Sequence, residues 1–209
     1  MLRTAALIAA ALIASPAAAQ VRLDLPTTQN VIGQTVDVRP VYALPYEEMQ
    51  VLAGRGYSVS TAVVSVASGN FLSVELANPA GSGVYYVLTS RVLSNNVVGG
   101  SAPLEYSRYA STATFPTSAA TNVTIGNRIA GGPPATGTFR YTMGTAAPAG
   151  AITSSGFIPT NGEEKRIKDV VILAPGTRLI YSVGGAGGGL AAMARIAVTF
   201  LFFTTPVPS

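Results

Sequence analysis

Short apolar or alternating runs, separated by clusters of Gly, Pro, Asn and Ser, make up most of this chain. Such spacing predicts the strands of an all-β sandwich or barrel. The runs are rich in β-branched and aromatic residues, which suit the pleated surface of a sheet. The predicted strands cover residues 35–42, 57–67, 71–76, 84–93, 104–110, 122–129, 137–143, 169–173, 178–183 and 190–203.

Residues 44–54 (LPYEEMQVLAG) break this pattern and predict a short helix. Pro45 suits the first helical position, and Gly54 suits the C-terminal cap. Glu47 and Glu48 suit the positive end of the helix dipole. No second helix of useful length is indicated, which argues against parallel βαβ units. The fold class predicted is therefore an all-β, jelly-roll-like antiparallel sandwich with one short helix.

The final predicted strand, LAAMARIAVTFLFF, is unusually long and apolar. One face is wholly apolar and holds Leu190, Ala192, Ala194, Ile196, Val198, Phe200 and Phe202. The other face also carries Met193, Leu201 and Phe203, beside Arg195 and Thr199. Three interpretations follow: a central strand buried on both sides, a strand shared with a neighbouring subunit, or a lipid-facing strand of an outer-membrane barrel.

Glycine-rich segments separate several of these strands. In NPAGSG (residues 78–83) no Lys follows the glycines and the next run is strand-like, so a phosphate-binding loop is not indicated. Pro79, Gly81 and Gly83 instead predict a corner between two strands. Residues 174–176 (APG) predict a hairpin with a type II-like turn. Residues 99–118 and 131–160 predict long loops that hold brief strands.

The first nineteen residues predict a secretory signal. Arg3 precedes an apolar run too short to cross a bilayer, and Ala17 to Ala19 form a small-residue cleavage site before Gln20. We expect three parts: a signal peptide over 1–19, an N-terminal arm with the first strand and the helix over 20–56, and a sandwich domain over 57–209. The arm from Val21 to Gln34 is the candidate for strand exchange between subunits.

The amino-acid composition excludes several classes of functional site. The chain has no Cys, His or Trp, which removes histidine-based triads and most zinc sites. Only 11% of its residues are charged and its mean hydropathy is +0.41, values typical of a surface that faces other subunits, lipid or a polymer. The net charge is +4, but the basic residues are scattered, so we predict no nucleic-acid binding.

No catalytic, cofactor or metal site is predicted. Glu163 and Glu164 are neighbours of Lys165, Arg166 and Lys168, which indicates a solvated charged loop. Four further acids stand alone in the sequence, namely Asp24, Asp37, Glu75 and Glu105. The candidate interface or ligand contacts are aromatic: Tyr85, Tyr86, Tyr106, Tyr109 and Tyr141.

A family resemblance rests on three features in order: NPAGSG after an apolar strand, VILAPGTRLIYSV at 171–183, and a glycine-rich link into the long final strand. Over residues 57–203 this series resembles the jelly-roll head domains of tailed-phage virion proteins and related bacterial surface proteins. The resemblance implies subunit packing and attachment, with no catalytic residues. The signal peptide departs from virion proteins and favours an exported cell-envelope protein.

The sequence thus predicts an exported, non-enzymatic structural or surface-attachment protein that self-associates or packs with other envelope subunits. The final location would be periplasmic, at the cell surface or extracellular. Two alternatives remain: a small outer-membrane β-barrel, and a secreted carbohydrate-binding module whose partner is a glycan. The missing Trp and the PVPS end argue against membrane insertion.

Overall fold

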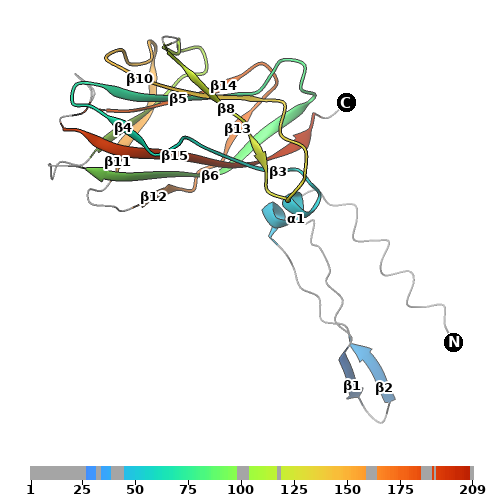
Figure 1. Cartoon of the computed structure of the whole chain (residues 1–209). Helices are drawn as coiled ribbons and strands as arrows, with labels where there is room; N and C mark the ends of the chain where they lie inside the picture. Colours follow the sequence, from blue (N-terminus) through green and yellow to red (C-terminus); the bar gives the residue numbers. More distant parts are fainter. Residues whose placement is uncertain are drawn as a thin grey trace.

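The computed structural model describes residues 27–31, 34–38, 45–97, 104–116, 119–158, 164–184, 190 and 192–207. In these residues the chain forms two facing β-sheets, a separate two-stranded sheet and one short helix (Figure 1). Neighbouring strands pair antiparallel throughout. The predicted all-β sandwich with one short helix is therefore confirmed, and its layers are compatible with a jelly roll.

The first large sheet has six strands in the order β11-β7-β14-β5-β10-β8. Their bounds are β5 Phe71–Ala77, β7 Leu104–Tyr109, β8 Thr121–Val123, β10 Thr138–Gly144, β11 Ile152–Ile158 and β14 Arg178–Val183. Strand β5 lies at its centre between β14 and β10, and β11 and β8 form its two edges.

The second large sheet has seven strands, with the main order β12-β6-β15-β3-β9. Strand β13 also pairs with β6, and β4 with β15. Their bounds are β3 Gly56–Ser60, β4 Val64–Val66, β6 Val84–Val97, β9 Gly126–Asn127, β12 Glu164–Ile167, β13 Val171–Leu173 and β15 Ala194–Pro206. The third, small sheet is a hairpin of β1 Thr27–Val31 and β2 Gln34–Val38.

The core lies between the two large sheets. Alternate residues of β5 and β15 point into it, because successive side chains of a strand face opposite sides. Leu72, Val74 and Leu76 come from one sheet, and the buried face of β15 comes from the other. Phe200 of β15 meets the ring of Phe139 edge-on across the core, at 5.6 Å between centroids. Burial of this apolar area is the main force that holds the layers together.

Strand β15 is central in its sheet but is not buried on both faces. Ala194, Ile196 and Val198 are fully buried, whereas Arg195 on the opposite face is exposed. The interpretation of a doubly buried strand is wrong for this half of β15. Near its end both Phe202 and Phe203 are buried, and Tyr46 of the helix packs edge-on against Phe203.

Helix α1 (Tyr46–Leu52) begins one residue later than expected, so Pro45 is the N-cap residue and not the first helical residue. Glu47 and Glu48 lie in the first turn, as predicted. Gly54 has a φ of +74°, and the amides of Gly54 and Arg55 donate to the carbonyls of Val51 and Gln50. This pattern is a Schellman motif, which glycine favours because it tolerates the left-handed conformation.

Several local predictions need correction. Segments 57–67 and 122–129 each contain two strands in place of one. The charged segment at 164–167 is the edge strand β12, not a loop, and β11 lies where long loops with brief strands were expected. The 174–176 turn exists, with Gly176 at φ +81°. It joins β13 and β14 of different sheets, so the predicted hairpin is wrong.

The corner at residues 78–83 is confirmed, since β5 ends at Ala77 and β6 begins at Val84 in the other sheet. Gly83 has a φ of +65°, whereas Gly81 is not among the residues with positive φ. The predicted signal over 1–19, most of the arm and the glycine run 185–189 lie outside the described residues.

Candidate functional site

The strands at the edges of the two large sheets differ in how they are protected against further strand pairing. Strands β4, β8 and β13 have only three residues each, and β9 has two. Strand β12 exposes Glu164, Lys165 and Arg166, and short or charged strands are usual protection for an edge. Strand β11 is seven residues long (ITSSGFI) and carries no charge. It is therefore the edge best suited to accept another strand.

Strand β11 also exposes apolar side chains. Ile152 is 49% exposed and Phe157 is 62% exposed. They oppose Tyr109 and Glu105 of β7, and Ser155 opposes Ser107. These residues share the outer face of the sheet, since directly opposite residues of an antiparallel pair lie on the same side. Ile152 and Phe157 thus place apolar area on this outer face, beside the uncharged edge.

Gly156 fits β11 closely against its neighbour. A Cβ atom at this position would lie 2.7 Å from the hydroxyl oxygen of Tyr106. Glycine inside a strand often marks such a close approach. Tyr106 occupies the space that a side chain at position 156 would need, so this position of β11 requires glycine.

A bulge limits the regular part of the free edge. The register between β11 and β7 shifts between Ile152 and Ser154, which leaves Thr153 as the extra residue. The Thr153 hydroxyl accepts a hydrogen bond from Nε of Arg108 at 3.0 Å and donates one to the Arg108 carbonyl at 3.2 Å. The regular edge available for pairing is thus the five-residue run 154–158.

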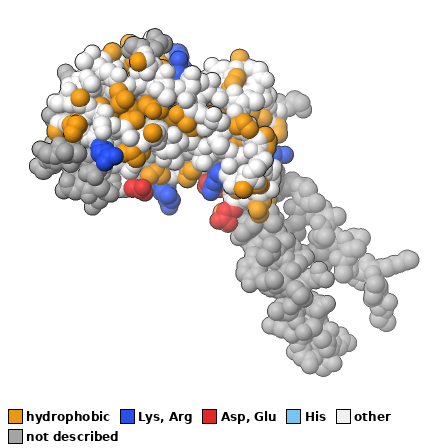
Figure 2. Space-filling model, in the orientation of Figure 1, with side chains coloured by type: hydrophobic (Ala, Val, Ile, Leu, Met, Phe, Trp, Pro, Cys, Tyr) orange, Lys and Arg blue, Asp and Glu red, His pale blue; other side chains and the backbone are white. Residues whose placement is uncertain are grey.

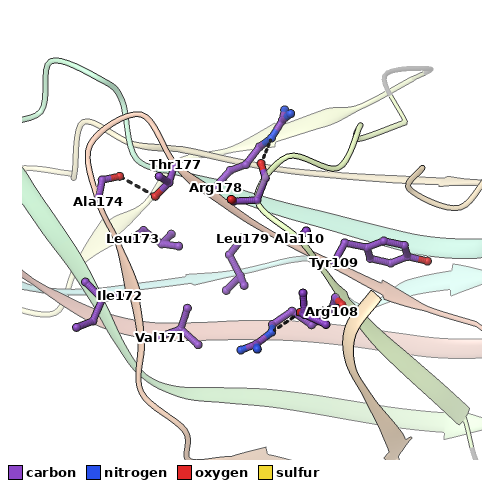
Figure 3. Close-up of a pocket in the computed structure, with 12 residues that line it drawn as sticks. Arg108, Tyr109, Ala110, Val171, Ile172, Leu173, Ala174, Thr177, Arg178 and Leu179 are labelled. Carbon is purple, nitrogen blue, oxygen red and sulfur yellow. Dashed lines mark hydrogen bonds between the residues drawn. The ribbon is translucent and has the colours of Figure 1, made fainter. Parts of the chain in front are cut away.

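A pocket of about 300 Å³ lies at the Thr153 end of this edge (Figure 3). Val171, Leu173 and Leu179 give it an apolar wall, and Arg108 and Arg178 also line it. In Figure 3 the two arginine side chains point away from each other. Both make ion pairs, Arg108 with Asp169 at 3.7 Å and Arg178 with Glu75 at 3.3 Å. The pocket therefore offers apolar area beside the free edge and no pair of converging cations.

Arg91 is a buried charged residue that the sequence did not indicate. A bulge at Thr89 shifts the register of β6 against β15, so that Arg91 opposes the core residue Phe200. The guanidinium donates to the Tyr181 hydroxyl and forms an ion pair with Asp169. Burial lowers the pKa of Arg91 and raises that of Tyr181, the latter despite the nearby guanidinium.

A second ion-pair group lies on the outer face of the six-stranded sheet. Glu75 at the centre of β5 is buried and is bound by Arg140 of β10 and Arg178 of β14. Arg140 also stacks over the ring of Phe115, at 4.7 Å from its centroid. Glu75 stands alone in the sequence, but in the fold it has two arginine partners. These groups pair with one another across strands, which indicates a structural role.

The five tyrosines predicted as contacts lie in different surroundings. Tyr86 is buried and stacks on Phe202 at 5.0 Å. Tyr109 is buried in a small outer cluster and reaches the pocket. Tyr106 and Tyr141 are half-buried against the core, and Tyr85 is half-buried one residue before Tyr86. Among the described residues no ring contact joins two of the five.

Two negative findings concern the described residues. No group of three or more acidic, cysteine or histidine side chains there is arranged to hold a metal ion. Within the same residues, no helix is long and apolar enough to cross a membrane. Comparison of the chain with protein-family models, curated proteins and solved structures finds no match.

Proposed function

We propose that this chain is an exported, non-enzymatic structural or surface-attachment protein that assembles from copies of itself in the cell envelope or outside the cell. The observation that carries the proposal is the uncharged edge strand β11, with Phe157 exposed beside it. Proteins usually protect such edges, because unpaired backbone N–H and C=O groups accept further strands. Among the described residues the other edge strands are short or charged, and this contrast favours β11 as a surface for pairing.

The rest of the surface supports this proposal. Figure 2 shows apolar side chains scattered over the visible face of the sandwich, with few charged groups between them. The whole chain has 11% charged residues, against about a quarter in ordinary globular domains. Low surface charge reduces the electrostatic repulsion between identical copies. The role agrees with the resemblance to jelly-roll heads of tailed-phage virion and bacterial surface proteins, which pack against one another.

Export is the second part of the proposal. It rests on the signal-like segment over residues 1–19, and cleavage after Ala19 would leave Gln20 at the N-terminus. The absence of Cys is compatible with an oxidising compartment, since the chain then has no thiol to mispair there. N-terminal sequencing of the protein from fractionated cells tests this part directly. A cytoplasmic protein that begins at Met1 would contradict it.

Sedimentation velocity of the mature chain tests the assembly. We expect species whose size grows with protein concentration. Replacing both Ser155 and Phe157 by Lys adds like charges to the β11 edge and should weaken association about tenfold or more, which corresponds to about 1.4 kcal/mol. Both side chains are exposed, so the variant should fold.

The matched control is Leu52→Lys on α1. Leu52 is 61% exposed, nearly the same as Phe157, and lies on the helix that packs beside β3 and β15. This control should assemble like the unmodified chain. A mature chain that stays monomeric at high concentration would overturn the proposal. Equal loss of assembly in the control and the β11 variant would show that general surface charge, not this edge, governs association.

A further inference from the structure

The β1–β2 hairpin has no further partner strand in the described part of the chain. Figure 1 shows it apart from the two large sheets. A lone two-stranded hairpin is marginally stable at best in water, and additional strands are needed for independent stability. The outer side of each of its strands therefore carries backbone groups that can pair with a further strand.

The β11 edge offers the hairpin a candidate partner strand. Its regular run of five residues, 154–158, equals the length of β1, Thr27–Val31. Neither β1 (TTQNV) nor β11 carries a charge, so no like-charge contact opposes their pairing. The edge strand β12 is shorter, with four residues, and exposes Lys165 and Arg166, so it is a poorer acceptor.

We propose that β1 of one copy adds antiparallel to the β11 edge of a second copy, so that the second copy's six-stranded sheet is extended by the two strands of the hairpin. This inference rests on the proposed function and names its two contact surfaces. Main-chain hydrogen bonds supply the pairing, as in other cases of strand addition. Phe157 and Ile152, both exposed on β11, flank the added strand and lose contact with water.

The pairing has a consequence for the shape of the assembly. The donor is the hairpin and the acceptor is β11, so the two contact surfaces differ. Such heterologous contacts build rings or open chains, whereas a contact between two β11 edges would stop at a two-fold dimer. A symmetric β11 contact would also leave every hairpin without a partner strand.

Cross-linking of single-cysteine variants tests this, because the natural chain has no Cys. The variants are Thr28→Cys on β1, Ser155→Cys on β11 and Leu52→Cys on α1, each in the mature chain. A short bis-maleimide, added to equimolar mixtures, reports which positions meet. The Thr28→Cys and Ser155→Cys mixture should give about tenfold more covalent dimer than the Thr28→Cys and Leu52→Cys mixture, because pairing raises the effective concentration of the two thiols. Sedimentation of each variant alone checks that assembly is kept.

The outcomes separate the two proposals. Covalent dimers mainly between two Ser155→Cys copies would overturn the hairpin as donor and leave assembly through β11 standing. Equal yields in the two mixtures would overturn the specific pairing. Assembly that persists with no cross-link to position 155 would overturn both the donor and the acceptor assigned here. A mature chain without any assembly would overturn the proposed function itself.

Discussion

Glu75 illustrates at the scale of single residues how this fold holds a charge in a mostly apolar sheet. The residue is 3% exposed, and its carboxylate lies between two guanidinium groups from the neighbouring strands. Leaving a buried carboxylate without partners is costly, so the three side chains behave as a unit. Arg140 and Arg178 are 65 and 103 residues away in sequence, and no local pattern could have placed them beside Glu75.

Three tyrosines give a prediction for alkaline pH. Burial raises the pKa of Tyr86, Tyr109 and Tyr181 above the ordinary value of 10.0. A raised folded-state pKa means that their contribution to stability is complete below pH 10 and is lost as the pH rises from there through the folded-state pKa. The free energy of unfolding should therefore fall above about pH 10.

Absorbance titration of tyrosinate, with urea unfolding at the same pH values, measures this effect. Part of the absorbance of the nine tyrosines should appear only at higher pH or together with unfolding. Ionisation of all nine near the ordinary pKa in a chain that stays folded would contradict the burial of these three hydroxyl groups.

At the scale of elements, the corner between β5 and β6 connects the two large sheets. Asn78 is buried, and its amide nitrogen donates to the carbonyls of Val84 and Leu173 at 2.8 and 2.9 Å. The corner thus ties the start of β6 to the end of β13, besides turning the chain from one sheet to the other. Pro79 and Gly83 indicated the turn in the sequence, but the role of the Asn78 amide depends on β13, far along the chain.

Gly83 and Gly81 in this corner form a matched pair for mutation. Gly83 has a φ of +65°, and Gly81 is not among the residues with positive φ, while a Cβ atom meets nothing within 4 Å at either position. Gly83→Ala should lower the free energy of unfolding by about 1 kcal/mol, because only the backbone conformation resists the side chain. Gly81→Ala should change it by less than about 0.5 kcal/mol. Urea unfolding measures both, and equal effects would contradict the conformational explanation.

The strands show what the sequence could and could not predict. The bounds of β14 were predicted to the residue, because RLIYSV is an apolar run between a Pro-Gly turn and a glycine. Arg91 was missed because the bulge at Thr89 reverses the alternation within β6 without a Gly or Pro to mark it. β11 was missed because ITSSGFI is rich in Ser and Gly, and its strand conformation depends on pairing with β7.

The location of the candidate site likewise could not be predicted without the tertiary structure. The composition predicted a surface suited to other subunits, and the arm was predicted to take part in strand exchange. The sequence could not tell which strand is an edge, because strand order depends on pairing between distant segments. The chemistry of tyrosine alone indicates contacts at five positions, but the structure places Tyr86 and Tyr109 in packed clusters. The sequence gives no sign that Phe157 is the most exposed aromatic ring among the described residues.

At the scale of the whole molecule, the two facing sheets leave one long uncharged edge among the described residues. The other edge strands are short or charged, as is common in soluble proteins, and β11 carries only a bulge at one end. Copies of the chain that pair there keep the sandwich core unchanged and add backbone hydrogen bonds at its side. Assembly should therefore leave the core unaltered and protect the backbone amides of β11 from hydrogen exchange.

Amide hydrogen exchange of the mature chain across a range of protein concentrations tests this claim most directly. Exchange reports on single strands, and β12 serves as an internal control because its charged edge should stay open. We predict that a peptide covering Ile152–Ile158 becomes more protected as assembly proceeds, while one covering Glu164–Ile167 does not change. Assembly with unchanged exchange in Ile152–Ile158 would contradict the account.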